Sequence, residues 1–199
     1  MRYLIVCGGK IDKEFGLNEI KTDGIDAIIA ADSGMDFLYE NGVTPDIIVG
    51  DFDSATTNAL EYFERKGQTE IRRLNPIKDD TDTEYAIRLA ISEGARSIVV
   101  LGATGSRIDH VLGNISLLGI GLESGTDICI IDTNNRIRMA DKPVTIEKSA
   151  QYGRFVSLIA VTDDNEVSLK GFKYPVTDYS FDRFTSLGHR LFHWISQAM

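Results

Sequence analysis

The sequence predicts an α/β fold, in which a Rossmann-like, doubly wound parallel sheet is followed by a small antiparallel β-sandwich domain. From the start to about residue 135, short apolar runs rich in β-branched residues alternate with helix-like stretches. This alternation is typical of a parallel sheet with helices on both faces. After about Asp141, short strand-like runs follow one another without a convincing helix. We therefore expect an α/β domain over residues 1–137 and a β-sandwich domain over residues 138–199.

The elements of the first domain are predicted from apolar periodicity. Strands are expected at Tyr3–Cys7, Ala27–Ala30, Ile47–Val49, Ile98–Leu101 and Ile128–Ile131, with a weaker candidate at Thr69–Leu74 that two arginines interrupt. Helices are expected at Met35–Glu40, Thr57–Lys66, Thr83–Ser92 and Ile108–Leu118. In the last of these, Ile108, Val111, Leu112 and Ile115 form one apolar stripe. Thr81 and Glu84 have the spacing of a capping box, which predicts a helix start there.

The second domain is predicted from three strand-like runs, at Val144–Glu147, Phe155–Val161 and Val167–Phe172. The polar segment 162–166 separates the last two runs. Clusters of Asp, Asn and Thr between apolar runs are typical of turns, so we expect these two strands to form a hairpin.

Composition narrows the classes of function. Apolar residues make up 43% of the chain and charged residues 26%, which is an ordinary globular balance. The formal net charge of −9 disfavours a nucleic-acid partner. We expect a cytoplasmic protein with no membrane partner, because only seven residues precede Gly8 and no apolar run approaches a membrane span. Cys7 and Cys129 lie in apolar runs, so we expect reduced core cysteines.

Two groups of acidic residues follow predicted strands. Asp51 and Asp53 come directly after the third strand, and Asp79, Asp80 and Asp82 follow the weak fourth one. In parallel sheets, ligands bind beyond the carboxyl ends of the strands. Clustered carboxylates without nearby His or Cys suit a hard cation, above all Mg²⁺. Some of these aspartates can instead cap helices or form turns.

A glycine-rich loop follows the Ile98–Leu101 strand. It runs from Gly102 through Gly105 to Arg107 and leads into a predicted helix. Free backbone N–H groups and the helix N-terminus favour phosphate, and the Arg107 guanidinium can fork onto phosphate oxygens. The loop is not a Walker A motif, since no Gly-Lys-Ser/Thr follows. Such a loop can also be only a tight turn, and His110 can be an ordinary surface histidine.

Four blocks of the sequence together resemble the thiamine pyrophosphokinase family. They are Ala31–Gly34 (ADSG), Pro45–Ser54 (PDIIVGDFDS), Lys78–Asp82 (KDDTD) and Leu101–Asn114 (LGATGSRIDHVLGN). The second and fourth blocks are long enough to be specific. The resemblance implies that the α/β domain binds the nucleotide and is catalytic, and that the β-sandwich domain serves thiamine binding and dimerisation.

The resemblance also implies roles for individual residues. Mg²⁺ would be held by Asp51, Asp53 and Asp82, and these three with Asp79 would be the catalytic residues. ATP would be bound by Asp32, Ser33, Gly34, Lys78, Thr104, Gly105, Arg107, Asp109 and His110. The implied partners are ATP, thiamine and a second copy of the chain, with thiamine bound by residues 138–199 of the partner subunit. The implied reaction moves the diphosphate of ATP onto the hydroxyl of thiamine.

The C-terminal tail, residues 181–199, departs from the family. Members usually carry a Gly-Ser/Thr-rich turn that leads to a Ser-Asn pair in contact with thiamine, and no Ser-Asn pair stands here. We therefore expect the chain to bind Mg²⁺–ATP but to turn over thiamine poorly.

Two alternative functions stay open on the sequence. The Asp51-Phe52-Asp53 run after an apolar strand also resembles a haloacid-dehalogenase-type phosphatase, in which Asp51 would be the phosphorylated nucleophile. Against this, the run follows the third strand and the Gly102–Arg107 loop is unexplained. The other alternative is a catalytically silent nucleotide-binding module.

Overall fold

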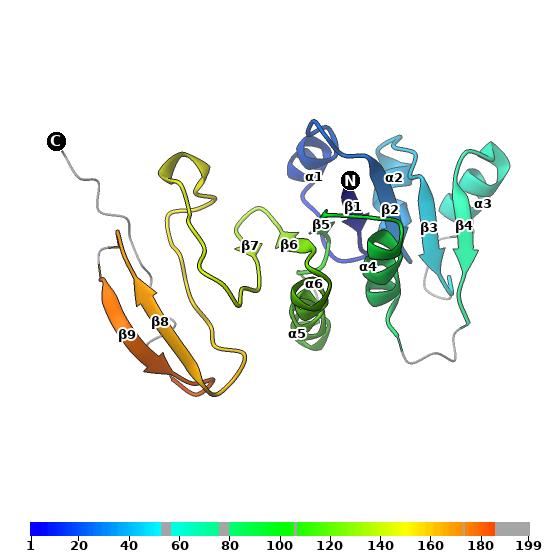
Figure 1. Cartoon of the computed structure of the whole chain (residues 1–199). Coiled ribbons are helices and arrows are strands. Elements are labelled where there is room, and N and C mark those ends of the chain that lie inside the picture. Colours follow the sequence, from blue (N-terminus) through cyan, green and yellow to red (C-terminus); the bar gives the residue numbers. More distant parts are fainter. Residues whose placement is uncertain (53–56, 76–79, 106, 173, 186–199) are drawn as a thin grey trace. The chain divides into compact units, whose positions relative to one another are not determined.

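The computed structural model describes residues 1–52, 57–75, 80–105, 107–172 and 174–185 (Figure 1). The chain divides into two compact units, Met1–Pro143 and Val144–Met199. The first contains a seven-stranded sheet in the order β4-β3-β2-β1-β5-β6-β7. The second contains a two-stranded antiparallel sheet. This architecture confirms the predicted fold class.

The first six strands of the large sheet run parallel and cover all six predicted positions. They are β1 (Arg2–Val6), β2 (Ala27–Ala31), β3 (Ile47–Gly50), β4 (Glu70–Arg73), β5 (Ser97–Leu101) and β6 (Asp127–Ile131). A short seventh strand, β7 (Arg136–Ile137), pairs antiparallel with β6. The central strands are nearly continuous apolar runs because helices cover both of their faces.

In the part of the chain that the structure describes, six helices connect these strands. They are α1 (Lys13–Ile20), α2 (Gly34–Glu40), α3 (Thr57–Lys66), α4 (Asp82–Ser92), α5 (Ile108–Ser116) and α6 (Leu118–Ser124). The predicted helix Ile108–Leu118 corresponds to α5, which ends at Ser116, and the unpredicted helix α6 begins at Leu118. The predicted cap of α4 is confirmed, since the Thr81 hydroxyl accepts a hydrogen bond from the Glu84 N–H at 3.1 Å.

Two apolar layers lie on the two faces of the sheet. Alternate residues of the strands point to opposite faces, so Ile5 and Val6 of β1 belong to different layers. One layer includes residues of α4 and α6, and the other includes residues of α1, α2 and α3. Figure 1 shows these two groups of helices on either side of the sheet. The sheet is therefore doubly wound.

The strand order reverses at β1. The chain first builds outward from β1 through β2 and β3 to β4, then returns to place β5 on the other side of β1. In open α/β sheets this topological switch point is where ligands bind, beyond the carboxyl ends of the strands. The carboxyl ends of β1 and β5 lead into Gly8 and Gly102, so the predicted glycine-rich loop starts at the switch point.

The second unit has a strand at one of its three predicted positions, Val167–Phe172, and differs at the other two. It contains β8 (Asn165–Leu169) and β9 (Val176–Phe181), which pair antiparallel, and a short 3-10 helix, η1 (Lys148–Ala150). The predicted strand at Val144–Glu147 is absent, and Phe155–Val161 contains only a single bridge residue, Val156. The predicted hairpin through residues 162–166 is therefore wrong, because β8 pairs with the segment that follows it. Residues 186–199 of the tail lie outside the described residues.

Both cysteines are free and buried, as predicted. Burial raises the pKa of the Cys7 thiol to about 11, so the thiol stays protonated at neutral pH. Among the helices that the structure describes, none is both long and apolar enough for a membrane crossing.

Candidate active site

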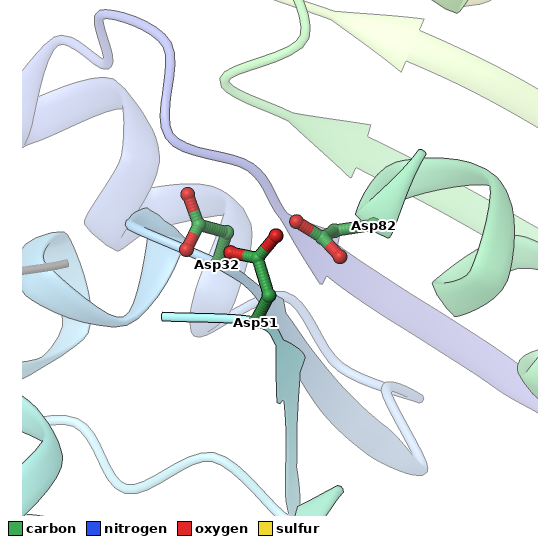
Figure 2. Close-up of side chains that lie close together, drawn as sticks. All are labelled: Asp32, Asp51 and Asp82. Carbon is green, nitrogen blue, oxygen red and sulfur yellow. The ribbon is translucent and has the colours of Figure 1, made fainter. Parts of the chain in front are cut away.

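Three aspartates from separate elements converge at the carboxyl edge of the sheet. Asp32 follows β2, Asp51 follows β3 and Asp82 is the first residue of α4. Each offers a carboxylate oxygen, and these oxygens all lie within 4.8 Å of one another. Figure 2 shows the three side chains pointing toward a common space. The side chains are half-buried, so the cluster is reachable from solvent.

The backbone around this cluster adopts conformations that L-residues rarely use. Asp32 has φ +48° and Phe52, next to Asp51, has φ +63°. Positive φ at a residue with a side chain costs on the order of 1–3 kcal/mol and persists only where the surroundings enforce it. Gly50 contributes to this, because a Cβ there would lie 3.1 Å from both the Asp32 Cα and the Phe52 ring. The strained turns after β2 and β3 are packed against each other.

The donor set of the cluster suits a divalent metal ion. Asp32, Asp51 and Asp82 supply only oxygen atoms, which are the ligands that Mg²⁺ prefers. Ionised carboxylates at this spacing repel one another, and a bound cation removes that repulsion. The residues present therefore fit the Mg²⁺ that the sequence predicts. Asp32, which the sequence assigned to ATP, lies with the metal candidates.

Glycines bring the loops after β1 and β5 into direct backbone contact. The Gly9 N–H donates to the Gly102 carbonyl at 2.9 Å. A Cβ on Gly9 would lie 2.3 Å from the Gly102 carbonyl oxygen, and one on Gly102 would lie 2.3 Å from the Cys7 carbonyl oxygen. No side chain fits at either position. The loops after β1 and β5 therefore pack backbone against backbone at the switch point.

Ser33 and Gly34 open α2 beside the cluster. Ser33 is the N-cap of α2, and its side chain makes no capping hydrogen bond. A Cβ on Gly34 would lie 1.9 Å from the Val6 carbonyl oxygen, so only glycine fits between α2 and β1.

Arg107 and Asp109 form a pair at the start of α5. Arg107 is the N-cap residue of this helix and forms a salt bridge with Asp109, with 2.6 Å between Nη2 and Oδ2. The hydrogen bonds from Arg107 lower the pKa of Asp109 to about 2. The His110 N–H also donates to Asp109, while the His110 residue itself is exposed. Asn114 donates to the Ala103 carbonyl at 2.9 Å, which ties α5 to the loop.

Thr104 contacts a residue that the sequence prediction missed. Its hydroxyl donates to the carboxylate of Asp132 at 2.8 Å, and Asp132 directly follows β6. The rule that selected Asp51, an acid directly after a strand, applies equally to Asp132. Gly105, next to Thr104, has φ +95°, and a Cβ there would lie 3.2 Å from the Lys10 Cβ.

Three predicted site residues lie outside the described residues. They are Asp53, Lys78 and Asp79. Their predicted roles, as Mg²⁺ ligand, ATP contact and catalytic residue, remain predictions.

Comparisons with known proteins identify the same family for both units. The model of "Thiamin pyrophosphokinase, catalytic domain" matches residues 21–130, and that of "Thiamin pyrophosphokinase, vitamin B1 binding domain" matches residues 143–188. A curated relative, thiamine pyrophosphokinase of Bacillus subtilis (strain 168), is 36% identical over 152 residues, which cover 75% of this chain and 70% of that protein.

Solved structures agree with these matches. The crystal structure of thiamine pyrophosphokinase from Bacillus subtilis has a TM-score of 0.84 at 31% identity, covering 97% of this chain and 90% of that one. The crystal structure of thiamin pyrophosphokinase from Geobacillus thermodenitrificans has a TM-score of 0.81 at 28% identity, covering 98% and 89%.

Proposed function

The chain belongs to the thiamine pyrophosphokinase family, and from this premise we propose that it transfers the diphosphate of ATP to the hydroxyl of thiamine with Mg²⁺. The products are thiamine diphosphate and AMP. The observation that carries the proposal is the convergence of Asp32, Asp51 and Asp82 on one space beside the switch point.

The carboxylate cluster provides the metal site in this proposal. Asp51 and Asp82 hold Mg²⁺ together with Asp53, and Asp32 lies close enough to join them. When bound, Mg²⁺ neutralises charge on the phosphate oxygens during transfer. An acidic rim alone would repel a polyanion, so metal binding and ATP binding should depend on each other.

The loops hold the nucleotide. The N-terminus of α5 and the glycine-rich loop before it meet the phosphates, and Lys78 and Arg107 supply positive charge. Asp109 keeps the Arg107 guanidinium in place through their salt bridge. Ser33, Gly34, Thr104, Gly105 and His110 complete the proposed ATP site.

The transfer needs little covalent chemistry from the protein. The hydroxyl oxygen of thiamine forms a bond to the β-phosphorus, the bond from that phosphorus to the α-phosphate oxygen breaks, and AMP leaves with the electron pair. The hydroxyl proton passes to a carboxylate of the rim, for which Asp51, Asp53, Asp79 and Asp82 are the candidates. Positioning and charge neutralisation supply most of the rate, as in other phosphoryl transfers.

The proposal also covers the cellular location, the oligomeric state and the division of labour along the chain. We propose a cytoplasmic homodimer in which residues 138–199 of the partner subunit bind thiamine. The division of the chain into 1–137 and 138–199 belongs to the same proposal, with the first part catalytic.

Thiamine-dependent AMP release from Mg²⁺–ATP tests the proposal. We expect AMP to appear with thiamine and not without it, and we expect Asp51→Asn to abolish the signal. Phosphate release that needs no thiamine would indicate the phosphatase alternative, which family membership disfavours. ATP binding without any turnover would indicate the silent nucleotide-binding module.

A further inference from the structure

Asp132 holds its carboxylate in a dense set of hydrogen bonds. The backbone N–H groups of Asn134 and Asn135 donate to Oδ1 at 2.7 and 2.8 Å, and the Asn135 side-chain amide donates to Oδ1 and Oδ2 at 3.0 and 3.1 Å. The Thr104 hydroxyl lies 2.8 Å from Oδ2. Burial raises the pKa of Asp132, but these hydrogen bonds outweigh it and the pKa lies below its usual value of 3.8. The carboxylate is therefore ionised at neutral pH.

An ionised carboxylate fixes the polarity of the Thr104 hydroxyl. A carboxylate can only accept hydrogen bonds, whereas a threonine hydroxyl has one proton to donate and two lone pairs. The one proton of Thr104 therefore points to Asp132. Only the lone pairs of the Thr104 oxygen are then available to a ligand, so this oxygen can accept a hydrogen bond but cannot donate one. An ionised phosphate oxygen is itself an acceptor and cannot pair with it.

Thr104 also lies on a well-anchored loop at some distance from the acidic cluster. Asn114 donates to the neighbouring Ala103 carbonyl, and Gly9 donates to the Gly102 carbonyl. Asp32 follows β2 and Thr104 follows β5, with β1 between those strands. Strands β2 and β5 are therefore two strand spacings apart, which is roughly 10 Å. A nucleotide whose phosphates meet the metal cluster can extend its nucleoside toward Thr104.

We infer that Asp132 is a positioning residue that fixes the Thr104 oxygen as an acceptor, and that Thr104 recognises an N–H or O–H donor on the nucleoside part of ATP. This inference rests on the proposed function. It narrows the predicted ATP contact of Thr104 to a contact that discriminates between nucleosides. The donor is either a ribose hydroxyl or the amino group of the base.

Two probes separate nucleoside contacts from phosphate contacts. Calorimetry with Mg²⁺–ATP and with Mg²⁺–tripolyphosphate is performed on the wild-type chain, Thr104→Val and Thr104→Ser. We expect Thr104→Val to weaken ATP binding roughly tenfold and to leave tripolyphosphate within about twofold, since one neutral hydrogen bond is lost. Thr104→Ser, which keeps the hydroxyl, should stay close to wild type. Equal weakening of both probes, or of neither, would overturn the inference.

Asp132→Asn tests the positioning role. An asparagine amide can donate to Thr104, which frees the hydroxyl proton to turn toward the ligand and reverses the polarity. We expect the same roughly tenfold loss of ATP binding, and no further loss in the double variant with Thr104→Val. The matched control is Asp127→Asn at the other end of β6, which should bind ATP normally. Additive losses would show that Asp132 acts independently of Thr104 and would refute its role.

Analogues identify the donor. ATP analogues lacking the 2′-hydroxyl, the 3′-hydroxyl or the amino group of the base are compared on wild type and Thr104→Val. One analogue should bind the wild-type chain about tenfold more weakly than ATP, and that difference should vanish in Thr104→Val. If none of the three analogues behaves in this way, the inference is wrong. If wild type releases AMP with thiamine while Thr104→Val binds ATP normally, only this inference fails; a wild-type chain that binds no Mg²⁺–ATP overturns the proposed function as well.

Discussion

The guanidinium of Arg107 donates two hydrogen bonds to the carboxylate of Asp109, from Nε at 3.1 Å and from Nη2 at 2.6 Å. Both side chains are largely exposed, at 71% and 62%. A guanidinium has five N–H groups, so this pair leaves others to meet a ligand. Asp109 therefore orients Arg107 at the N-terminus of α5 without consuming its capacity to bind phosphate.

Arg107→Lys should weaken ATP binding about tenfold and thiamine binding much less, because a point charge cannot replace a two-pronged contact. Titration of each substrate in the thiamine-dependent AMP assay gives the two apparent affinities. Arg88→Lys is the matched control, since Arg88 also donates two hydrogen bonds to a neighbouring acid, both to one oxygen of Glu84 on α4. An unchanged affinity for ATP in Arg107→Lys would remove Arg107 from the site.

The pKa of Asp109 should respond to a substitution that removes the positive charge of Arg107. Hydrogen bonds from Arg107 hold it at about 2, so the carboxylate stays ionised until the pH falls through that value. In Arg107→Gln we expect the pKa to rise toward the ordinary 3.8. Carboxyl-carbon NMR between pH 6 and pH 3, all on the ionised side of a pKa of 2, would show a flat signal for wild type and a titrating one for the variant. A wild-type carboxylate that titrates near 3.8 would refute the pairing in solution.

Asp51→Asn and Asp82→Asn should each abolish turnover while leaving the fold intact. Each removes a charged oxygen ligand but keeps the side-chain shape, and loss of even an outer-shell partner of a metal costs about 10–100-fold. In the absence of Mg²⁺, the midpoint of thermal unfolding of each variant should not lie below that of the wild-type chain, because one of three carboxylates that repel one another has been removed. Activity is measured across a Mg²⁺ titration, with the exposed Asp23→Asn as control. Near-wild-type rates at low Mg²⁺ would exclude the residue from the metal site.

Gly9→Ala and Gly113→Ala should have opposite effects on stability. A Cβ at Gly9 would meet the Gly102 carbonyl oxygen at 2.3 Å, so the two loops must separate at a cost of roughly 1–3 kcal/mol. Gly113 lies in α5 with nothing within 4 Å of its Cβ position, and alanine there should stabilise the helix by about 0.5–1 kcal/mol. Urea unfolding measures both. Equal effects would show that the loops after β1 and β5 are not closely packed against each other.

The central strands of the large sheet could be predicted because burial on both faces leaves an apolar run, whereas the partly exposed edge strand β4 was a weaker candidate and the short edge strand β7 was missed. Helix α1 was missed because its sequence contains Gly16, which disfavours a helix. The structure explains this glycine, since a Cβ there would lie 2.6 Å from the Ile11 side chain and 2.7 Å from the Phe37 ring. Asp12, whose side chain accepts from the Phe15 N–H at 2.9 Å, was the available signal for the helix start.

The hairpin of the second unit could not be predicted from its turn alone. Asn165 and Thr162 do form a local hydrogen-bonded bend, in which the Asn165 amide donates to the Thr162 carbonyl at 2.6 Å. That bend leads into β8 and does not join two paired strands. Strand pairing depends on contacts between distant residues, here Val167 with Tyr179, and a local sequence pattern carries no record of them.

The candidate site was predicted in part. Asp51 and Asp82 were predicted because each follows a predicted strand, and the structure brings them together with Asp32. Asp32 lies beside Asp51 and Asp82 with a backbone φ of +48°. The sequence alone does not specify that an aspartate adopts this conformation. The contact between Thr104 and Asp132 joins residues 28 positions apart through adjacent strands, so it becomes visible only once the order of β5 and β6 is known.

The fate of the β-phosphorus tests the central claim most directly. The chain is incubated with Mg²⁺, thiamine and ATP that carries a radioactive β-phosphorus, and the labelled products are separated. We predict that the label appears in thiamine diphosphate, in equal amount to the AMP released, and that neither forms in Asp51→Asn. Label that remains in ADP, or that leaves as free phosphate or pyrophosphate without thiamine, would contradict diphosphate transfer by this chain.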